Sequence, residues 1–367
     1  MKSLKRIFCI GLVFILSVVL FACGQTENKV EITEIQVLEH QETMIRGEEY
    51  DESSVKLEVK FSDGTSSVYS GSDLYFNYNN FDFFTPGKYT IEIRIIPLKV
   101  TKEIPVEVKR QSIKILMVAN SFGDDTVQWV HEIGDNLGID FTIANLYIGG
   151  CILDTHLTNL KNNNKDYEYV HYNKATKQWD RKDYTSIADA MKMEDWDYIS
   201  LQQGSYQSGK ADTYNTIDAI MDRILELKSD VEFLWNMTWA YQSDSGHANF
   251  YMYDHDQMKM YNDIVNAVQT KVIPNERFKY IIPNGTAVQN ARTSQLGDTL
   301  CRDVYCHLTL TLGRYIAGLT LVGTVADVDI REVTYSPNIT ELEKIIAIES
   351  VVNALNEPYK VTESSYK

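Results

Sequence analysis

A change of rhythm at residue 113 constrains the fold more than any other feature of the sequence. From there on, short apolar runs alternate with stretches in which apolar residues recur at helical spacing. The runs predict strands at 113–119, 141–148, 197–202, 231–235 and 280–283. The helical stretches lie at 127–137, 212–228, 257–272, 308–325 and 339–355. This alternation predicts a three-layer α/β domain over residues 111–360, a five-stranded parallel sheet with helices on both faces.

Residues 31–110 carry a different pattern. Residues 55–61 alternate apolar and charged, which is the period of a half-buried strand, and Asp63-Gly64 predicts a hairpin turn directly afterwards. With no helical period, the stretch predicts a small all-β sandwich. It resembles bacterial Ig-like domains through "FSDGT", "TPGKYTIEIRI" and "VEVK". Such domains act as spacers or carbohydrate-binding modules, and we expect a spacer.

The first residues predict export. A basic start and an apolar run at 7–21 end in a small residue before Cys23. This order is typical of a signal peptide, here residues 1–22. Leu-Phe-Ala-Cys resembles a bacterial lipobox, which implies that Cys23 is lipidated and that 23–30 serve as a tether. We therefore expect a protein lipid-anchored at the bacterial cell surface or envelope; an unlipidated signal peptide or an N-terminal anchor helix stays open.

The charge excludes some partners. The net charge is −16, and removal of a signal with three cations and no acids gives −16 − 3 = −19. A chain this acidic does not bind nucleic acid or anionic lipid non-specifically. We therefore expect contact with a membrane only through the lipid anchor.

Three cysteines remain beyond the signal and the predicted lipidation site: Cys151, Cys301 and Cys306. An odd number does not indicate a disulfide framework, and the spacing does not indicate a zinc site. We expect buried, reduced thiols. One disulfide stays open in an oxidising exterior.

Polar residues follow the predicted strands, where α/β folds bind their ligands. Ser121 stands at the first strand-to-helix turn, which exposes its hydroxyl. Gly149-Gly150 follows the second strand, and a free N–H there can donate to an oxyanion. Gln202 and Gln203 follow the third, and a carboxamide is also a suitable donor. Taken singly, each residue fits a helix cap, a turn or a loop.

A histidine and a carboxylate lie near the last predicted helices. Asp303 and His307 form the orienter-and-base half of a catalytic triad, although a helix-capping pair would look the same. The order of nucleophile, glycine, amide and Asp/His is that of the SGNH (GDSL-like) hydrolases.

The resemblance spans about residues 110–330, through "ILMVANSFGDD", "YIGGC", "WDYISLQQGS" and "LCRDVYCHLTLTLGRYIAGLT". Ala119 replaces the usual Gly of the first block. Gln203 before a Gly resembles the sialate and carbohydrate acetylesterase branch. The resemblance implies that Ser121 is the nucleophile, His307 the base and Asp303 its orienter. It also implies an oxyanion hole formed by Ser121, Gly150 and Gln203.

One departure concerns Asp303 and His307, which have three residues between them where the family has two. An extra residue that bulges out would preserve the geometry. Alternatively, Asp303 is not the orienter, or the domain is a degenerate enzyme. The spacing therefore leaves the third member of the triad open.

These observations predict a serine esterase that hydrolyses O-acyl, and by resemblance O-acetyl, esters on extracellular carbohydrate. Its partner would be an acylated glycan or another small ester, without a cofactor or metal. The alternative is a non-catalytic surface glycan-binding lipoprotein. A transporter's substrate-binding lipoprotein fits poorly, because it needs two similar α/β lobes. A metal hydrolase also fits poorly, because no His lies within five positions of Asp124 or Asp125 to complete a metal site with them.

Overall fold

The computed structural model describes residues 29–367. The predicted signal at 1–22, Cys23 and most of the predicted tether lie outside the described residues. Two compact units are present: one consists of 29–41, 51–77 and 92–104, and the other of 42–50, 78–91 and 105–367. Within residues 29–367, no helix is long and apolar enough to cross a bilayer.

The N-terminal part of the described chain is built from strands and short 3-10 turns. One antiparallel sheet has the order β1-β3-β4, and a four-stranded sheet has the order β2-β7-β6-β5. Their bounds are Ile32–Glu39 (β1), Thr43–Ile45 (β2), Lys56–Phe61 (β3), Ser66–Ser70 (β4), Leu74–Asn77 (β5), Gly87–Ile95 (β6) and Val100–Lys109 (β7). Side chains of β6 and β7 alternate between buried and exposed, as the sequence pattern predicts. The assignment to the Ig-like domains stays a prediction.

The predicted hairpin between β3 and β4 is confirmed. The two strands pair antiparallel from Lys56↔Ser70 to Lys60↔Ser66. Between them, Asp63 accepts a hydrogen bond from the N–H of Thr65 at 2.9 Å. Gly64 adopts φ +84°, a conformation that glycine reaches without steric cost.

The α/β region is built on one sheet of order β11-β10-β9-β8-β12-β13-β14. Five neighbouring strands are parallel and correspond to the five predicted strands: β8 (Gln111–Ala119), β9 (Ile139–Tyr147), β12 (Tyr198–Leu201), β13 (Glu232–Asn236) and β14 (Phe278–Ile282). The predicted total of five strands is wrong. An antiparallel hairpin, β10 (Tyr167–Asn173) and β11 (Gln178–Thr185), extends the sheet beyond β9.

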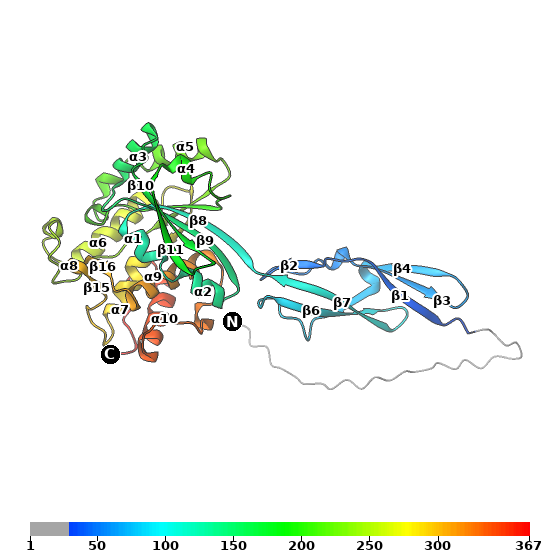
Figure 1. Ribbon diagram of the computed structural model, residues 1–367. Helices are drawn as coiled ribbons and strands as arrows, with labels where there is room; N and C mark the ends of the chain where they lie inside the picture. The colour runs from blue at the N-terminus through cyan, green and yellow to red at the C-terminus, as the bar shows by residue number, and fades with distance from the viewer. Residues whose placement is uncertain (1–28) are drawn as a thin grey trace, which may run out of the picture. The chain divides into compact units, whose positions relative to one another are not determined.

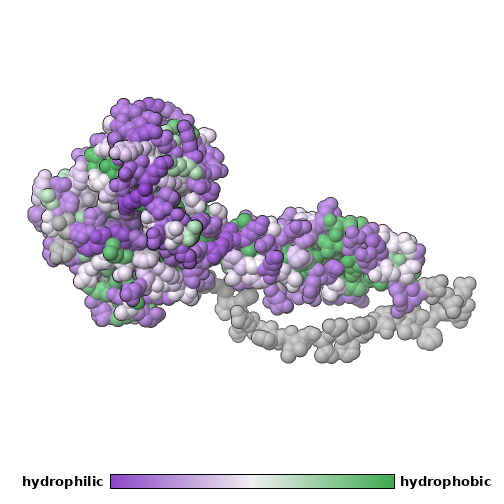
Figure 2. Space-filling view, viewed as in Figure 1, coloured by the Kyte–Doolittle hydropathy of each residue, from purple (hydrophilic) through white to green (hydrophobic). Residues whose placement is uncertain are grey.

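Two groups of helices lie on opposite sides of this sheet (Figure 1). In one group, α9 packs against α1, α2, α7 and α10, and in the other α3 packs against α4 and α5. The bounds are Ser121–Val127 (α1), Val130–Asn136 (α2), Leu153–Asn162 (α3), Ile187–Ala190 (α4), Ile217–Leu227 (α5), Gln257–Ala267 (α6), Asn284–Arg292 (α7), Leu312–Val325 (α9) and Glu341–Asn356 (α10). The predicted three-layer arrangement is present, although α3, α4 and α7 were not predicted. The face of this region seen in Figure 2 is mostly hydrophilic.

A chain of buried amides crosses the carboxyl edge of the parallel strands. Its members lie on or just after β9, β8, β12, β13 and β14, in the order of the strands: Asn145, Asn120, Gln202, Asn236 and Asn284. Each is at most 1% exposed. We call these five residues the amide ladder.

The ladder is held by hydrogen bonds between neighbouring members. Gln202 donates to Oδ1 of Asn120 at 2.9 Å, Asn236 to Oε1 of Gln202 at 2.7 Å, and Asn284 to Oδ1 of Asn236 at 2.7 Å. Asn145 donates to the backbone oxygen of Asn120 at 3.1 Å. Because a buried amide is costly unless it is paired, these bonds fix the ends of the strands relative to one another.

Replacement of Asn236 by Ala tests the ladder. The change removes the partner of the buried amide oxygen of Gln202. It also leaves the buried amide nitrogen of Asn284 with only the Thr126 hydroxyl, at 3.5 Å. We expect the free energy of unfolding to fall by about 2–5 kcal/mol. Urea denaturation followed by circular dichroism measures it. Asn356→Ala, an exposed change at the end of α10, is the matched control; equal effects of both changes would argue against the ladder.

Candidate active site

Ser121 is the first residue of α1, directly after β8. Asn120 caps the helix, because its Oδ1 accepts a hydrogen bond from the N–H of Phe122 at 2.9 Å. The N–H groups of a first helical turn have no partner within the helix, so the turn favours negative charge beside it. Ser121 is partly exposed. Its hydroxyl therefore lies at the sheet edge, beside backbone donors.

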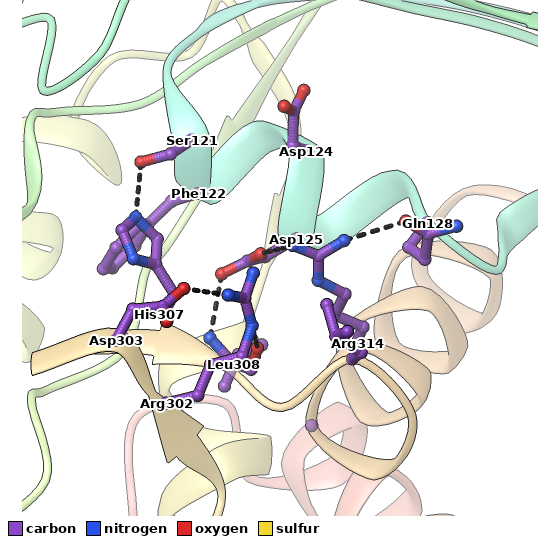
Figure 3. A network of polar contacts seen from close by, with 12 residues as sticks. Ser121, Phe122, Asp124, Asp125, Gln128, Arg302, Asp303, His307, Leu308 and Arg314 are labelled. Carbon is purple, nitrogen blue, oxygen red and sulfur yellow. Dashed lines mark hydrogen bonds and ion pairs between the residues drawn. The ribbon is translucent and has the colours of Figure 1, made fainter. Parts of the chain in front are cut away.

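His307 is the residue that the fold brings to Ser121. A small hairpin pairs β15 (Cys301–Arg302) with β16 (His307–Leu308), and the short helix α8 (Asp303–Cys306) joins them. Nε2 of His307 lies 2.8 Å from Oγ of Ser121, which is hydrogen-bond distance (Figure 3). The two residues are 186 positions apart in the sequence. The predicted nucleophile and base are thus adjacent, although their catalytic roles stay predictions.

The surroundings of His307 favour its neutral imidazole. Burial lowers the pKa of His307 below its ordinary value of 6.5, and the positive charges of Arg302 and Arg314 lower it further. Among the main contributions, only the negative charge of Asp124 raises this pKa. A neutral imidazole can accept a proton from the Ser121 hydroxyl.

Asp303 does not have the position that the sequence suggests. Its backbone adopts φ +46°, and its carboxylate forms an ion pair with the neighbouring Arg302. Within the described part of the chain, Nδ1 of His307 contacts Sγ of Cys306 at 3.6 Å, and no carboxylate hydrogen-bonds to it. The structure thus brings Ser121 and His307 together without Asp303 as the orienter.

A second carboxylate, Asp125, lies one turn after Ser121 on α1 and is completely buried. Its Oδ2 accepts a hydrogen bond from the N–H of Leu308 at 2.8 Å, and its Oδ1 lies 2.7 Å from Nη2 of Arg314 (Figure 3). The contact with Arg314 is an ion pair without hydrogen-bond alignment. Burial raises the pKa of Asp125 to about 6, against the opposing effects of Arg314 and the Leu308 N–H.

Gly150 and Gln203 differ in how free they are to bind an oxyanion. Gly150 has φ +65°, and a Cβ added there would meet nothing within 4 Å, so the backbone borders open space. In contrast, both amide hydrogens of Gln203 are used, because Nε2 donates to the backbone oxygen and the hydroxyl of Thr213 at 3.1 and 2.9 Å. Its Oε1 accepts from the N–H groups of Leu153 and Gly204. In this structure Gln203 is therefore hydrogen-bonded to the segments around Leu153 and Thr213, and its amide is not free to bind an oxyanion.

The three remaining cysteines, Cys151, Cys301 and Cys306, are free and buried. Within residues 29–367, no group of three or more His, Cys, Asp or Glu side chains could hold a metal ion.

Sequence reasoning missed Asp125 as a site residue and missed the amide ladder. Asp125 lies four positions after Ser121, the spacing that places two residues on one face of a helix. Amides at the ends of several apolar runs were the corresponding signal for the ladder. Both signals were visible in the sequence, but neither shows which group each side chain has as its hydrogen-bond partner.

The comparison with solved structures finds relatives at different distances. A crystal structure of a DUF4886 family protein from Bacteroides uniformis is 39% identical, with a TM-score of 0.64, and the match covers 69% of this chain and 98% of that protein. A proposed SGNH hydrolase from Slackia heliotrinireducens is 18% identical, with a TM-score of 0.38, over 59% of this chain and 100% of its own. A family 3 carbohydrate esterase from Clostridium thermocellum is 11% identical, with a TM-score of 0.37, over 60% and 98%. Because the last two TM-scores lie below 0.5, these proteins say nothing about the chemistry of this chain.

The search of curated proteins found no match. A family model described as "Domain of unknown function (DUF4886)" matches residues 114–352, which is more than half of the chain and includes Ser121, Gly150 and His307. The chain therefore belongs to the DUF4886 family.

Proposed function

We propose that the protein is a serine esterase with Ser121 as nucleophile and His307 as general base. The observation that carries the proposal is the 2.8 Å contact between Oγ of Ser121 and Nε2 of His307 at the start of α1. This pair has the geometry of an activated nucleophile. The lowered pKa of His307 supports it, because the base must be neutral before it can act.

The reaction proceeds in two steps. His307 takes the proton of Ser121 as Oγ attacks the ester carbonyl, and it then gives that proton to the leaving alcohol. Water attacks the acyl-enzyme with His307 as base. His307 then returns this proton to Oγ of Ser121 as the acyl bond breaks and the acid leaves. The backbone N–H groups of Ser121 and Gly150 are the proposed oxyanion donors; neither donates a hydrogen bond within the described part of the chain. Gln203 could join them only by releasing Thr213.

The proposed substrate is an acetylated extracellular carbohydrate. Two sequence features support it: the resemblance around Gln203 to carbohydrate acetylesterases and the predicted lipoprotein signal at residues 1–22. On this proposal the protein works outside the cell, tethered through Cys23, and the residues at 31–110 act as a spacer. No nucleic acid, metal or cofactor takes part.

A second candidate function has one observation in its favour. The Asp303 carboxylate pairs with Arg302 and leaves Nδ1 of His307 beside a thiol. A site without an orienting carboxylate suits a glycan-binding protein that does not cleave its ligand.

Removal of the nucleophile separates the two candidates. Purified full-length protein in detergent should release acetate from 4-nitrophenyl acetate and from members of a panel of acetylated glycans. Ser121→Ala should reduce turnover by about a thousandfold or more, because it removes the attacking oxygen. The measurement is enzymatic detection of free acetate.

The control is Ser66→Ala, an exposed change on β4, which should leave turnover unchanged. Equal activity of the parent and Ser121→Ala would exclude Ser121 as nucleophile. A folded parent protein that binds an acetylated glycan without releasing acetate would favour the binding function.

The pH dependence should report the pKa of His307. The base works in its neutral form, and its pKa is lowered, so the neutral form persists below pH 6.5. We expect kcat/KM to rise with pH along an acid limb whose midpoint lies below 6.5. Arg302→Gln removes a charge that lowers this pKa, so its midpoint should move upward. A parent midpoint at or above 6.5 would contradict the assignment.

A further inference from the structure

We propose that Trp239 and Asp125 are positioning residues, which fix His307 by holding the peptide groups on either side of it. This inference rests on the proposed function, in which His307 is the base. We call the two contacts the backbone clamp: the indole of Trp239 with the carbonyl of Cys306, and the carboxylate of Asp125 with the N–H of Leu308.

Trp239 forms the first contact of the clamp. Its Nε1–H donates a hydrogen bond to the backbone oxygen of Cys306 at 2.8 Å. Trp239 is completely buried and follows β13, a central strand whose end is fixed by the amide ladder. A tryptophan N–H has one direction and one hydrogen to donate. The carbonyl that precedes His307 is therefore tied to the rigid edge of the sheet.

Asp125 forms the second contact. Its Oδ2 accepts from the N–H of Leu308 at 2.8 Å, and the ion pair with Arg314 on α9 holds the carboxylate from its other side. Asp125 belongs to the same short helix as Ser121. The helix that contains Ser121 thus also binds the peptide group that follows His307, through the side chain of Asp125.

The ring of Phe122 contacts both Trp239 and the imidazole of His307. It stacks on Trp239 with centroids 4.2 Å apart and an angle of 5° between the planes, and it meets the imidazole of His307 edge-on at 5.7 Å. Ser121, Phe122 and Asp125 therefore meet the His307 segment through a hydroxyl, a ring and a carboxylate. These contacts constrain the backbone of His307 and the rotation of its ring together.

The clamp supplies part of what a triad carboxylate does. Such a carboxylate orients the imidazole and stabilises its charged form. Two buried hydrogen bonds to the flanking peptide groups provide orientation without a carboxylate at Nδ1. The three residues between Asp303 and His307 can then be accommodated, because the position of His307 does not depend on Asp303.

The test compares two buried tryptophans whose indole N–H each donates to a backbone oxygen. Trp239→Phe keeps an aromatic ring beside Phe122 but deletes the N–H that reaches Cys306. The matched control is Trp196→Phe, because Trp196 is also buried and its Nε1–H donates to the backbone oxygen of Ala190 at 2.9 Å. Both variants of the full-length protein lose one buried hydrogen bond of the same kind, so their melting temperatures should fall by similar amounts.

Only Trp239→Phe should affect the chemistry. We expect its kcat for 4-nitrophenyl acetate to fall about tenfold or more with KM unchanged, because small displacements of a catalytic group are costly. Trp196→Phe should keep the parent kcat. Equal kcat values in the two variants would overturn the proposal. A conservative rescue adds to the test: Asp125→Asn keeps an oxygen for Leu308 and should retain more turnover than Asp125→Ala.

A second readout does not need enzymatic activity. NMR titration of the His307 imidazole should give a pKa below 6.5 in the parent and in Trp196→Phe. In Trp239→Phe the imidazole of His307 is held less firmly and becomes more exposed to solvent, so its pKa should rise towards 6.5. If the parent hydrolyses no ester, the proposed function fails, and this titration alone decides the clamp: an unchanged pKa in Trp239→Phe would overturn it.

Discussion

The site depends on the hydrogen bonds that the side chain of Asn120 forms. Its Oδ1 accepts from the N–H of Phe122 and from Gln202, and its Nδ2 donates to the backbone oxygen of Cys151 at 3.0 Å. One amide thus fixes the start of α1, joins it to the ladder and holds the loop that contains Gly150. Because all of these groups are buried, a lost bond leaves a partner unsatisfied, and the arrangement is rigid for that reason.

The parallel strands were predictable, and the antiparallel hairpin was not. Strands of a parallel sheet are buried on both faces, so their sequences are continuous apolar runs such as 113–119. The hairpin at 167–185 has few such signals, because β11 is exposed along most of its length and its strand structure comes from pairing with β10. Local pattern does not record a contact made by the backbone.

The site shows the same division. The order of motifs predicted that Ser121 and His307 would meet, and the structure places them in contact. The order of motifs could not predict that Gln203 would donate both amide hydrogens to Thr213. Nor could it predict that Trp239 would donate to the carbonyl of Cys306. Residue types indicate which chemistry is available. Which partner each group finds depends on loop geometry.

The hairpin at the margin of the sheet has a consequence for self-association. β11 is the outermost strand there, and its exposed stretch carries consecutive charges, Asp180, Arg181, Lys182 and Asp183. An outermost strand offers unpaired backbone groups to any other extended chain, and charged side chains oppose such pairing. Without the hairpin, the apolar β9 would form that margin. The hairpin therefore opposes strand pairing between copies of the protein, even at high protein concentration.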